Sequence, residues 1–164
     1  MKINPTIFRE YDIRGIAGSE FTPKMIAEYE KWYGPFPGIT ITTDAAEAIG
    51  KAYGTMIRRE RESGTRTEIG SLYKGKPRIV IGHEIRPFAE ELKTAFINGA
   101  RATGCDVTDI GVALTPIVYF NVATDGYDGG INVTGSHNVY FYNGFKMMKK
   151  DNWPLFAEQI REMQ

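Results

Sequence analysis

The sequence predicts an α/β fold of three layers, α/β/α, in which helices cover both faces of a mostly parallel mixed sheet. β-branched and apolar runs at 78–82, 107–112 and 131–133 have the length of buried strands, and stretches with helical spacing separate them. Strands that alternate with helices are typical of a parallel sheet with right-handed crossovers. With 164 residues, of which 42% are hydrophobic and 24% charged, the chain is predicted to form one domain over residues 1–164.

The amino-terminal third predicts a short extended segment and two helices. Residues 11–15 form the extended segment, which its glycine is expected to end. Thr22 and Pro23 then open a helix as cap and first residue, and the Gly-Pro-Phe-Pro-Gly run at 34–38 ends it. A second helix begins at Thr43. Apolar residues at helical spacing are expected to turn both helices toward the core: Met25, Ile26, Tyr29, Trp32 and Tyr33, then Ala45, Ile49, Ala52, Tyr53, Met56 and Ile57.

The rest of the chain continues the alternation of strands and helices. Residues 63–76 are polar and contain glycine, so we expect an exposed loop there. A helix over 88–103 ends at a glycine, and another starts at the Thr-Pro pair 115–116. After the strand at 131–133, residues 147–150 are expected to form a paired edge strand. A terminal helix is expected over 151–164.

The polar loop after residues 131–133 is the candidate site. Open α/β sheets bind ligands outside the carboxyl ends of their strands, which is where this loop lies. It carries the hydroxyl of Ser136, the imidazole of His137 and the amide of Asn138, and Lys146 follows with a positive charge. This set suggests phosphate handling. From the residues alone, an ordinary turn is an equally good interpretation, because such side chains often hydrogen-bond their own backbone.

Three stretches of the chain resemble motifs of one family, in that family's order. Thr134–Asn138 (TGSHN), followed by Tyr142–Lys146 (YNGFK), resembles the active-serine loop of the α-D-phosphohexomutases, which include phosphomannomutase, phosphoglucomutase and phosphoglucosamine mutase. Residues 8–15 (FREYDIRG) resemble the amino-terminal signature of that family. Gly-Val and Leu-Thr-Pro within residues 111–116 resemble a third motif between these two.

The resemblance implies a phosphoserine mechanism and an isomerase reaction. By this likeness Ser136 carries a phosphoryl group and gives it to a hexose 1-phosphate or 6-phosphate. It takes the other phosphate back after the hexose 1,6-bisphosphate intermediate has reoriented, and that bisphosphate also serves as activator. Phosphoryl transfer needs charge neutralisation. The resemblance therefore implies Mg²⁺, bound to Ser136 through its phosphate, with its main ligands in a domain that this chain lacks.

The resemblance also implies roles for the residues around the serine. His137 and Lys146 are expected to transfer a proton or to hold the phosphate, with Arg14 supporting them, and the identity of the base stays open. The residues expected to bind substrate or phosphate are Asn138, Thr134 and Arg86.

The sequence departs from the family pattern at several places. Val139 stands where a proline is usual, which removes a fixed φ and brings the rigidity of the loop into question. His83 and Glu84 replace an arginine and an aspartate, while Arg86 matches the second arginine of that motif. Two helix starts before the first central strand suggest an insertion around 21–40, to which the sequence assigns no role.

Whole motifs of the family are missing as well. No Asp-x-Asp-x-Asp-Arg metal loop and no sugar-recognition motif occurs in the sequence. We therefore expect this chain to be the amino-terminal domain, domain I, of a longer multidomain mutase and to be inactive by itself. The expected partners are a hexose phosphate and the remaining domains of the parent enzyme. The sequence does not decide between mannose, glucose and glucosamine phosphates.

The same residues disfavour two other interpretations and leave one open. A serine hydrolase is disfavoured, because Ser136 lacks a Gly-x-Ser-x-Gly elbow and the adjacent His137 cannot easily face its hydroxyl. A metal site at His83 and Glu84 is disfavoured, because no third ligand occurs at a recognised spacing. A non-catalytic module that binds a sugar phosphate or a protein on the same fold stays open as the alternative.

Charge and cysteine content limit the partners and the compartment. Lysine plus arginine equals aspartate plus glutamate at 20 each, so the net charge favours neither nucleic acid nor a membrane surface. The single Cys105 cannot form an internal disulfide, which favours a reducing compartment. Residues 1–5 lack the apolar run of a signal peptide. We therefore expect a cytoplasmic protein that binds neither nucleic acid nor membrane.

Overall fold

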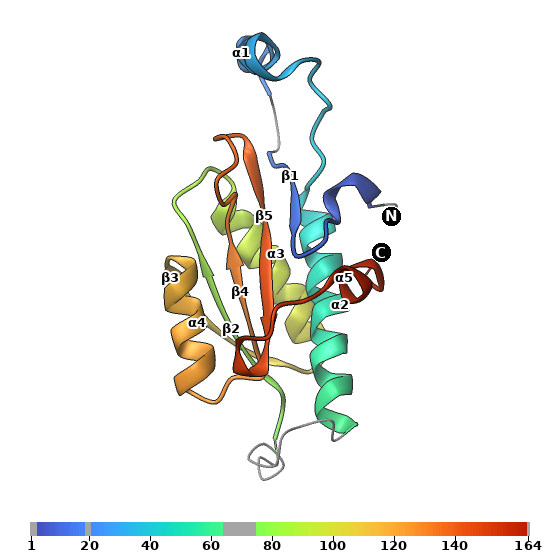
Figure 1. Cartoon of the computed structure of the whole chain (residues 1–164), viewed down its shortest axis with the longest axis vertical. Coiled ribbons are helices and arrows are strands. Elements are labelled where there is room, and N and C mark those ends of the chain that lie inside the picture. Colours follow the sequence, from blue (N-terminus) through green and yellow to red (C-terminus); the bar gives the residue numbers. More distant parts are fainter. Residues whose placement is uncertain (1–2, 19–20, 64–74, 164) are drawn as a thin grey trace.

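A five-stranded mixed sheet forms the centre of the molecule, with strand order β1-β5-β4-β2-β3. The computed structural model describes residues 3–18, 21–63 and 75–163 (Figure 1). Its strands are β1 (Ile13–Ile16), β2 (Arg78–His83), β3 (Asp106–Val112), β4 (Gly129–Val133) and β5 (Tyr142–Lys149). β2 pairs in parallel with β3 and β4, whereas β5 is antiparallel to β4 and β1. Only β5 among these strands opposes the others, which confirms the predicted mostly parallel mixed sheet.

Helices cover both faces of the sheet and complete the predicted three layers. α2 and α3 lie on one face and α4 on the other (Figure 1). The bounds of the helices are α1 (Pro23–Tyr33), α2 (Thr43–Glu62), α3 (Ala89–Ala102), α4 (Thr115–Thr124) and α5 (Ala157–Arg161), with 3-10 turns η1 (Pro5–Ile7) and η3 (Lys150–Asn152). The Thr22 hydroxyl caps α1 by accepting from the Met25 N–H, and the Thr42 hydroxyl caps α2 by accepting from the Ala45 N–H.

The core has a large part beneath α2 and α3 and a smaller part beneath α4. Tyr53, Phe96 and Phe145 fill the centre of the large part and have no exposed surface. α2 and α3 approach closely because two glycines face the contact. A Cβ atom on Gly50 would collide with the backbone of Phe96, and one on Gly99 would collide with the backbone of α2. The smaller part consists of Val80, Val118, Val122, Tyr127 and Met148.

The register of β4 and β5 positions the candidate loop. β4 ends at Val133, and the loop that follows lies at the carboxyl end of the parallel strands, as predicted. β5 returns beside β4, so that Lys146 lies opposite Asn132. The Lys146 Nζ atom is 5.8 Å from the centre of the Tyr119 ring. Lys146 therefore faces α4 rather than α2 and α3.

The predicted edge strand and terminal helix were wrong in part. β5 begins at Tyr142 and is internal, because β1 pairs with its outer side and brings Ile13 opposite Phe145. A pairing over so long a separation leaves no trace in the local pattern. The terminal helix is only the short α5, because Asp151 and Asn152 have positive φ angles of 59° and 60°, which stop helical winding.

The predicted core side of α1 was also wrong. Tyr29 is buried, but Trp32 is 69% exposed and Tyr33 50% exposed. α1 stands beyond the end of the sheet rather than on it (Figure 1). Tyr29 of α1 and Phe21, just before the helix, instead meet Phe141, which follows the candidate loop. Most of the predicted loop at 63–76 lies outside the described residues.

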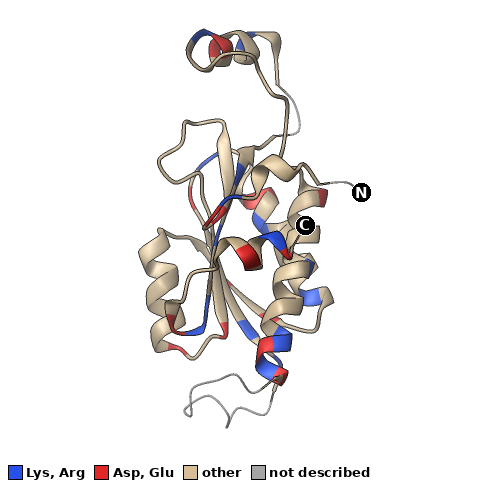
Figure 2. Ribbon diagram, turned by 45° about the vertical axis from the view of Figure 1, so that its right-hand side comes forward, with Lys and Arg blue, Asp and Glu red and all other residues tan. Residues whose placement is uncertain are grey.

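Charged residues of both signs lie together at one end of α2. Figure 2 shows lysine or arginine next to aspartate or glutamate at the carboxyl end of α2, where Arg58 and Glu62 are 3.7 Å apart. Interleaved charges of both signs are typical of a solvated helix end. Within the described ranges, no helix combines the length and the apolar character needed to cross a membrane.

Candidate active site at the Ser136 loop

Short hydrogen bonds within the loop hold Ser136 at an exposed bend. The buried Thr134 hydroxyl accepts from the Ser136 N–H at 2.8 Å. The Asn138 side-chain amide donates to the Gly135 carbonyl at 2.9 Å, and the Asn138 N–H donates to the same carbonyl at 3.1 Å. Ser136 has a φ of 54°, in the left-handed region that side chains other than glycine rarely adopt. Such conformations persist only where surrounding contacts enforce them, and they cluster at functional sites.

The hydroxyl of Ser136 faces solvent beside His137. Ser136 and His137 are both exposed, and the Ser136 Oγ atom lies 3.4 Å from the His137 Nδ1 atom. This distance is long for a hydroxyl hydrogen bond. Lys146 is half-buried on the next strand and faces α4. The expectation that adjacent His137 cannot easily face the hydroxyl was therefore wrong, because the turn brings the imidazole beside it. Lys146 lies at the base of the loop.

Arg14 lies beneath the loop and is only 2% exposed. Its Nη1 atom donates to the Thr134 carbonyl at 2.8 Å, where β4 runs into the loop, and its Nη2 atom is 2.9 Å from a carboxylate oxygen of Asp12. Burial lowers the pKa of Arg14, and the negative charges of Asp12 and Glu84 oppose that shift. Arginine nevertheless stays charged in proteins. Arg14 therefore fixes the start of the loop and puts a positive charge below it.

Arg86 reaches into the loop from the segment after β2. Its two Nη atoms donate to three loop carbonyls, those of Ser136, Asn138 and Val139, and to that of Tyr142, the first residue of β5. Its Nε atom is 2.6 Å from a carboxylate oxygen of Glu84. The resemblance implied that Arg86 binds phosphate, but in this structure its donors point at the loop backbone.

The structure adds residues to the site that sequence reasoning missed. The same Glu84 oxygen accepts from the Gly135 N–H at 2.5 Å. The Asn132 amide, in the orientation that satisfies its neighbours, donates to the Gly82 carbonyl at 3.1 Å and accepts from the Thr115 N–H at 3.0 Å. Asn132 thereby ties β4 to β2 and to the start of α4. The sequence signal that could have identified Asn132 is that it is a polar residue inside the otherwise apolar run 131–133.

His83 and its neighbours show no metal centre. His83 is 7% exposed, and its Nδ1 atom lies 3.0 Å from the Glu84 carbonyl oxygen. Among the residues that the structure describes, no group of three or more histidine, cysteine, aspartate or glutamate side chains could hold a metal ion.

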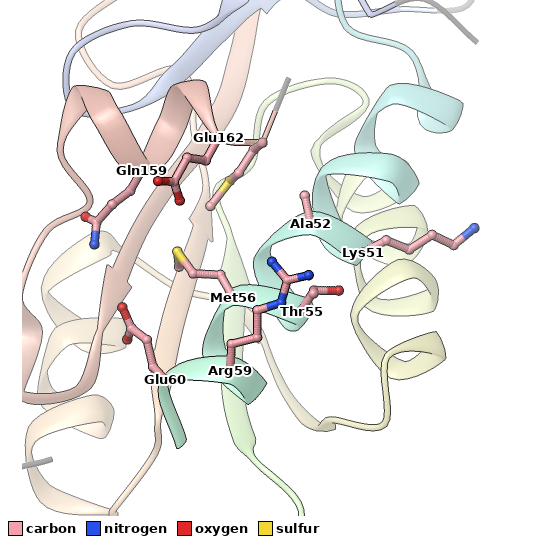
Figure 3. Close-up of a pocket in the computed structure, with 9 residues that line it drawn as sticks. Lys51, Ala52, Thr55, Met56, Arg59, Glu60, Gln159 and Glu162 are labelled. Atoms are coloured by element: carbon pink, nitrogen blue, oxygen red, sulfur yellow. The ribbon is translucent and has the colours of Figure 1, made fainter. Parts of the chain in front are cut away.

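A cavity of about 430 Å³ lies away from the loop, between α2 and α5 (Figure 3). Met56 and Met163 supply apolar surface, and the rim carries two basic and two acidic side chains. Opposite charges on one rim do not select an ion, and Glu60 is already paired with Lys149 at 2.9 Å. The nine residues that line this cavity are Lys51, Ala52, Thr55, Met56, Arg59, Glu60, Gln159, Glu162 and Met163. It supplies no residue to the Ser136 loop.

The fold and the loop together define an α/β/α domain that presents an exposed serine at the carboxyl end of its sheet. Residues 30–164 match the family model of phosphoglucomutase/phosphomannomutase, alpha/beta/alpha domain I. The chain is 32% identical over 153 residues to a phosphoglucomutase/phosphomannomutase of Thermococcus kodakarensis and 32% identical over 160 residues to a phosphomannomutase of Vibrio cholerae. The chain belongs to the phosphoglucomutase/phosphomannomutase family.

The alignments also show how much of each relative's length this chain covers. The two alignments cover 93% and 97% of this chain but only 26% and 28% of those relatives. A crystal structure of a phosphoglucomutase/phosphomannomutase family protein from Burkholderia thailandensis superposes with a TM-score of 0.72 at 30% identity. That superposition covers 99% of this chain and 30% of the other. The chain thus spans about a quarter of the length of these relatives.

Proposed function

We propose that this chain is the catalytic-serine domain of a phosphohexomutase, an intramolecular phosphotransferase. Ser136 carries a phosphoryl group and exchanges it with the 1- and 6-positions of a hexose phosphate through a hexose 1,6-bisphosphate. The observation that carries this proposal is an exposed serine hydroxyl on a strained backbone at the carboxyl end of the sheet. Membership of the mutase family supports the same chemistry.

The residues around Ser136 have separable roles in this proposal. His137, whose ring nitrogen lies 3.4 Å from the serine oxygen, accepts or returns the proton of the hydroxyl. Lys146 is the second candidate for this role and otherwise attracts the phosphate as a point charge. Arg14 adds a buried positive charge beneath the loop. The side chains of Thr134 and Asn138 hold the loop that carries the hydroxyl and, in this proposal, border the phosphate.

The residues of the chain fit a magnesium ion only in part. A phosphate on the exposed Ser136 hydroxyl offers one oxygen ligand, and magnesium bound there would neutralise the charge of the transferring group. The nearby Glu84 carboxylate is committed to Arg86 and to the Gly135 N–H. We therefore propose that the main ligands come from another domain of the parent enzyme, and that this chain does not complete the reaction alone.

The compartment is part of the proposal as well. Cys105 is free and buried, and burial raises the pKa of its thiol, so the protonated and unreactive form is favoured. An unpaired cysteine of this kind supports a reducing, cytoplasmic location.

An activity assay on two preparations tests the proposed function. The 164-residue chain and the protein purified from its natural source are each given glucose 1-phosphate, glucose 1,6-bisphosphate and magnesium. We expect glucose 6-phosphate from the natural protein and none from the chain alone. Turnover by the chain alone would overturn the proposed incompleteness.

A matched variant separates catalysis from binding. Ser136→Ala in the natural protein is expected to abolish turnover while leaving the fold intact, because Ser136 is exposed. A natural protein that binds hexose phosphate without turnover, with or without Ser136, would instead be a non-catalytic module.

A further inference from the structure

We propose that Arg86 and Glu84 form a clamp that fixes the backbone of the Ser136 loop, and that Arg86 is a positioning residue rather than a phosphate ligand. The consequence for phosphoryl transfer rests on the function proposed above. The clamp itself is a property of the folded chain. It can therefore be tested without any enzymatic assay.

The contacts of Arg86 use the whole guanidinium. An arginine side chain has five N–H donors in a rigid planar fork. The Nη1 atom donates to the carbonyls of Val139 at 2.6 Å and Tyr142 at 3.0 Å. The Nη2 atom donates to the carbonyls of Ser136 at 2.8 Å and Asn138 at 2.7 Å. With the Nε atom 2.6 Å from Glu84, no donor of Arg86 is left for a phosphate.

Glu84 completes the clamp from the other side. One oxygen of its carboxylate receives both the Arg86 Nε–H and the Gly135 N–H. The side chains of Arg86 and Glu84 are 17% and 21% exposed, so solvent screens this pair less than it screens a surface ion pair. The carboxylate also offsets the charge of the guanidinium, which weakens the attraction of Arg86 for an anion.

The clamp accounts for two features of the loop. Ser136 has a strained φ of 54°, and its carbonyl accepts a hydrogen bond from Arg86. This contact opposes relaxation of the strained angle. A Cβ atom on Gly135 would collide with the Arg86 guanidinium and with the Tyr142 carbonyl, so glycine is needed where the chain crosses the arginine.

The clamp also answers the question raised by Val139. A proline at this position would fix φ, but valine leaves it free to rotate in an unrestrained loop. In this structure the Val139 carbonyl accepts from Arg86 and from the Tyr142 N–H at 2.9 Å. Order that a proline ring would provide is supplied here by hydrogen bonds.

Amide hydrogen exchange of the 164-residue chain tests the clamp. Exchange rates at 135–139 are compared in the wild type, Arg86→Lys, Arg86→Met and the control Arg101→Met, which removes an exposed arginine of α3. Both Arg86 variants are expected to exchange at least about tenfold faster in the loop, because lysine has only three donors and no planar fork. Amides of β2 and β4 and the Arg101 variant are expected to match the wild type.

Two outcomes of this experiment would overturn the clamp. One is wild-type loop exchange in Arg86→Met, and the other is full restoration of loop protection by lysine. Should an Arg86 variant not fold, Glu84→Gln provides the same test. It keeps an oxygen acceptor and removes the charge, so loop exchange is expected to rise by about three- to tenfold.

Phosphate binding and turnover distinguish positioning from ligation. Glucose 1,6-bisphosphate is titrated into each variant of the natural protein, and turnover is measured in parallel. For a positioning residue, Arg86→Lys lowers kcat at least about tenfold and leaves the affinity within about threefold. Lost affinity with wild-type loop exchange would make Arg86 a ligand and overturn the proposal. If the wild type shows no turnover, the proposed function fails, and hydrogen exchange still decides on the clamp.

Discussion

Tyr53 of α2 is buried at the centre of the large core and reaches the backbone of the sheet. Its hydroxyl donates to the Met148 carbonyl at 2.6 Å and lies 3.5 Å from the Gly130 carbonyl. Burial, followed by the nearby charge of Glu60, raises the pKa of Tyr53 well above its ordinary value. The fold therefore stabilises the neutral phenol and disfavours its ionised form.

Tyr53 should make the stability of the fold depend on alkaline pH. Folding raises the pKa of the Tyr53 phenol above its value in the unfolded chain, which is about 10. The stability that the neutral phenol contributes is therefore fully present below about pH 10 and is lost as the pH rises above that value. We expect Tyr53→Phe to destabilise the fold by roughly 1–2 kcal/mol at pH 8, through the lost hydrogen bond. The difference from wild type should shrink between about pH 10 and 11. Urea unfolding over this range measures it, and a constant difference would contradict the assignment.

At the scale of single residues, the sequence predicted which side chains share the loop but not what holds the loop in place. Ser136, His137 and Asn138 lie together in the expected loop, because neighbours in sequence stay neighbours in a short turn. Glu84 and Arg86 lie far from that loop in sequence, and their contacts depend on the parallel pairing of β2 and β4. No local pattern shows which carbonyls an arginine will meet.

At the scale of elements, the segment around α1 is the least expected feature. Phe141 follows the Ser136 loop. The centre of its ring lies 5.7 Å from the ring centre of Phe21 and 6.0 Å from that of Tyr29. Phe36 closes the group at 4.7 Å from Phe21 and 5.4 Å from Tyr29. A helix of 11 residues is marginal by itself. These aromatic contacts therefore hold α1 against the segment around Phe141, which follows the Ser136 loop.

Removal of Phe141 should release the α1 segment. In Phe141→Ala, the ring contacts to Phe21 and Tyr29 are lost, and we expect limited proteolysis between 21 and 40 to become about tenfold faster. Trp32→Ala is the matched control, because Trp32 lies on α1 and is 69% exposed. Cleavage equal to wild type in Phe141→Ala would show that α1 is held by other contacts.

Elements governed by local signals were predicted closely. α1 and α2 begin within one residue of their threonine caps, and β2, β3 and β4 lie where the apolar runs predicted them. The errors concern long-range pairing and orientation. β5 becomes internal through β1, and Tyr29 of α1 packs on Phe141 instead of on the sheet. A periodic pattern shows that a helix has an apolar side but does not show what covers it.

At the scale of the molecule, one side of the sheet exposes apolar side chains. α4 is apolar around much of its circumference, yet Leu114 before it and Ile117 and Phe120 within it are 70%, 51% and 66% exposed. Val112, at the end of the edge strand β3, is 64% exposed. Several large exposed apolar side chains on neighbouring elements are typical of a face that another part of a protein covers. It supports the proposal that this domain acts together with the rest of a longer mutase.

Phosphopeptide mapping of the natural protein tests the central proposal most directly. The intact mass is measured first, and the peptide spanning 131–146 is then analysed after incubation with glucose 1,6-bisphosphate and magnesium. The proposal predicts a chain longer than 164 residues that carries one phosphoryl group on Ser136, which Ser136→Ala removes. A folded natural protein without phosphate in this peptide would contradict the role of Ser136 and favour a binding module.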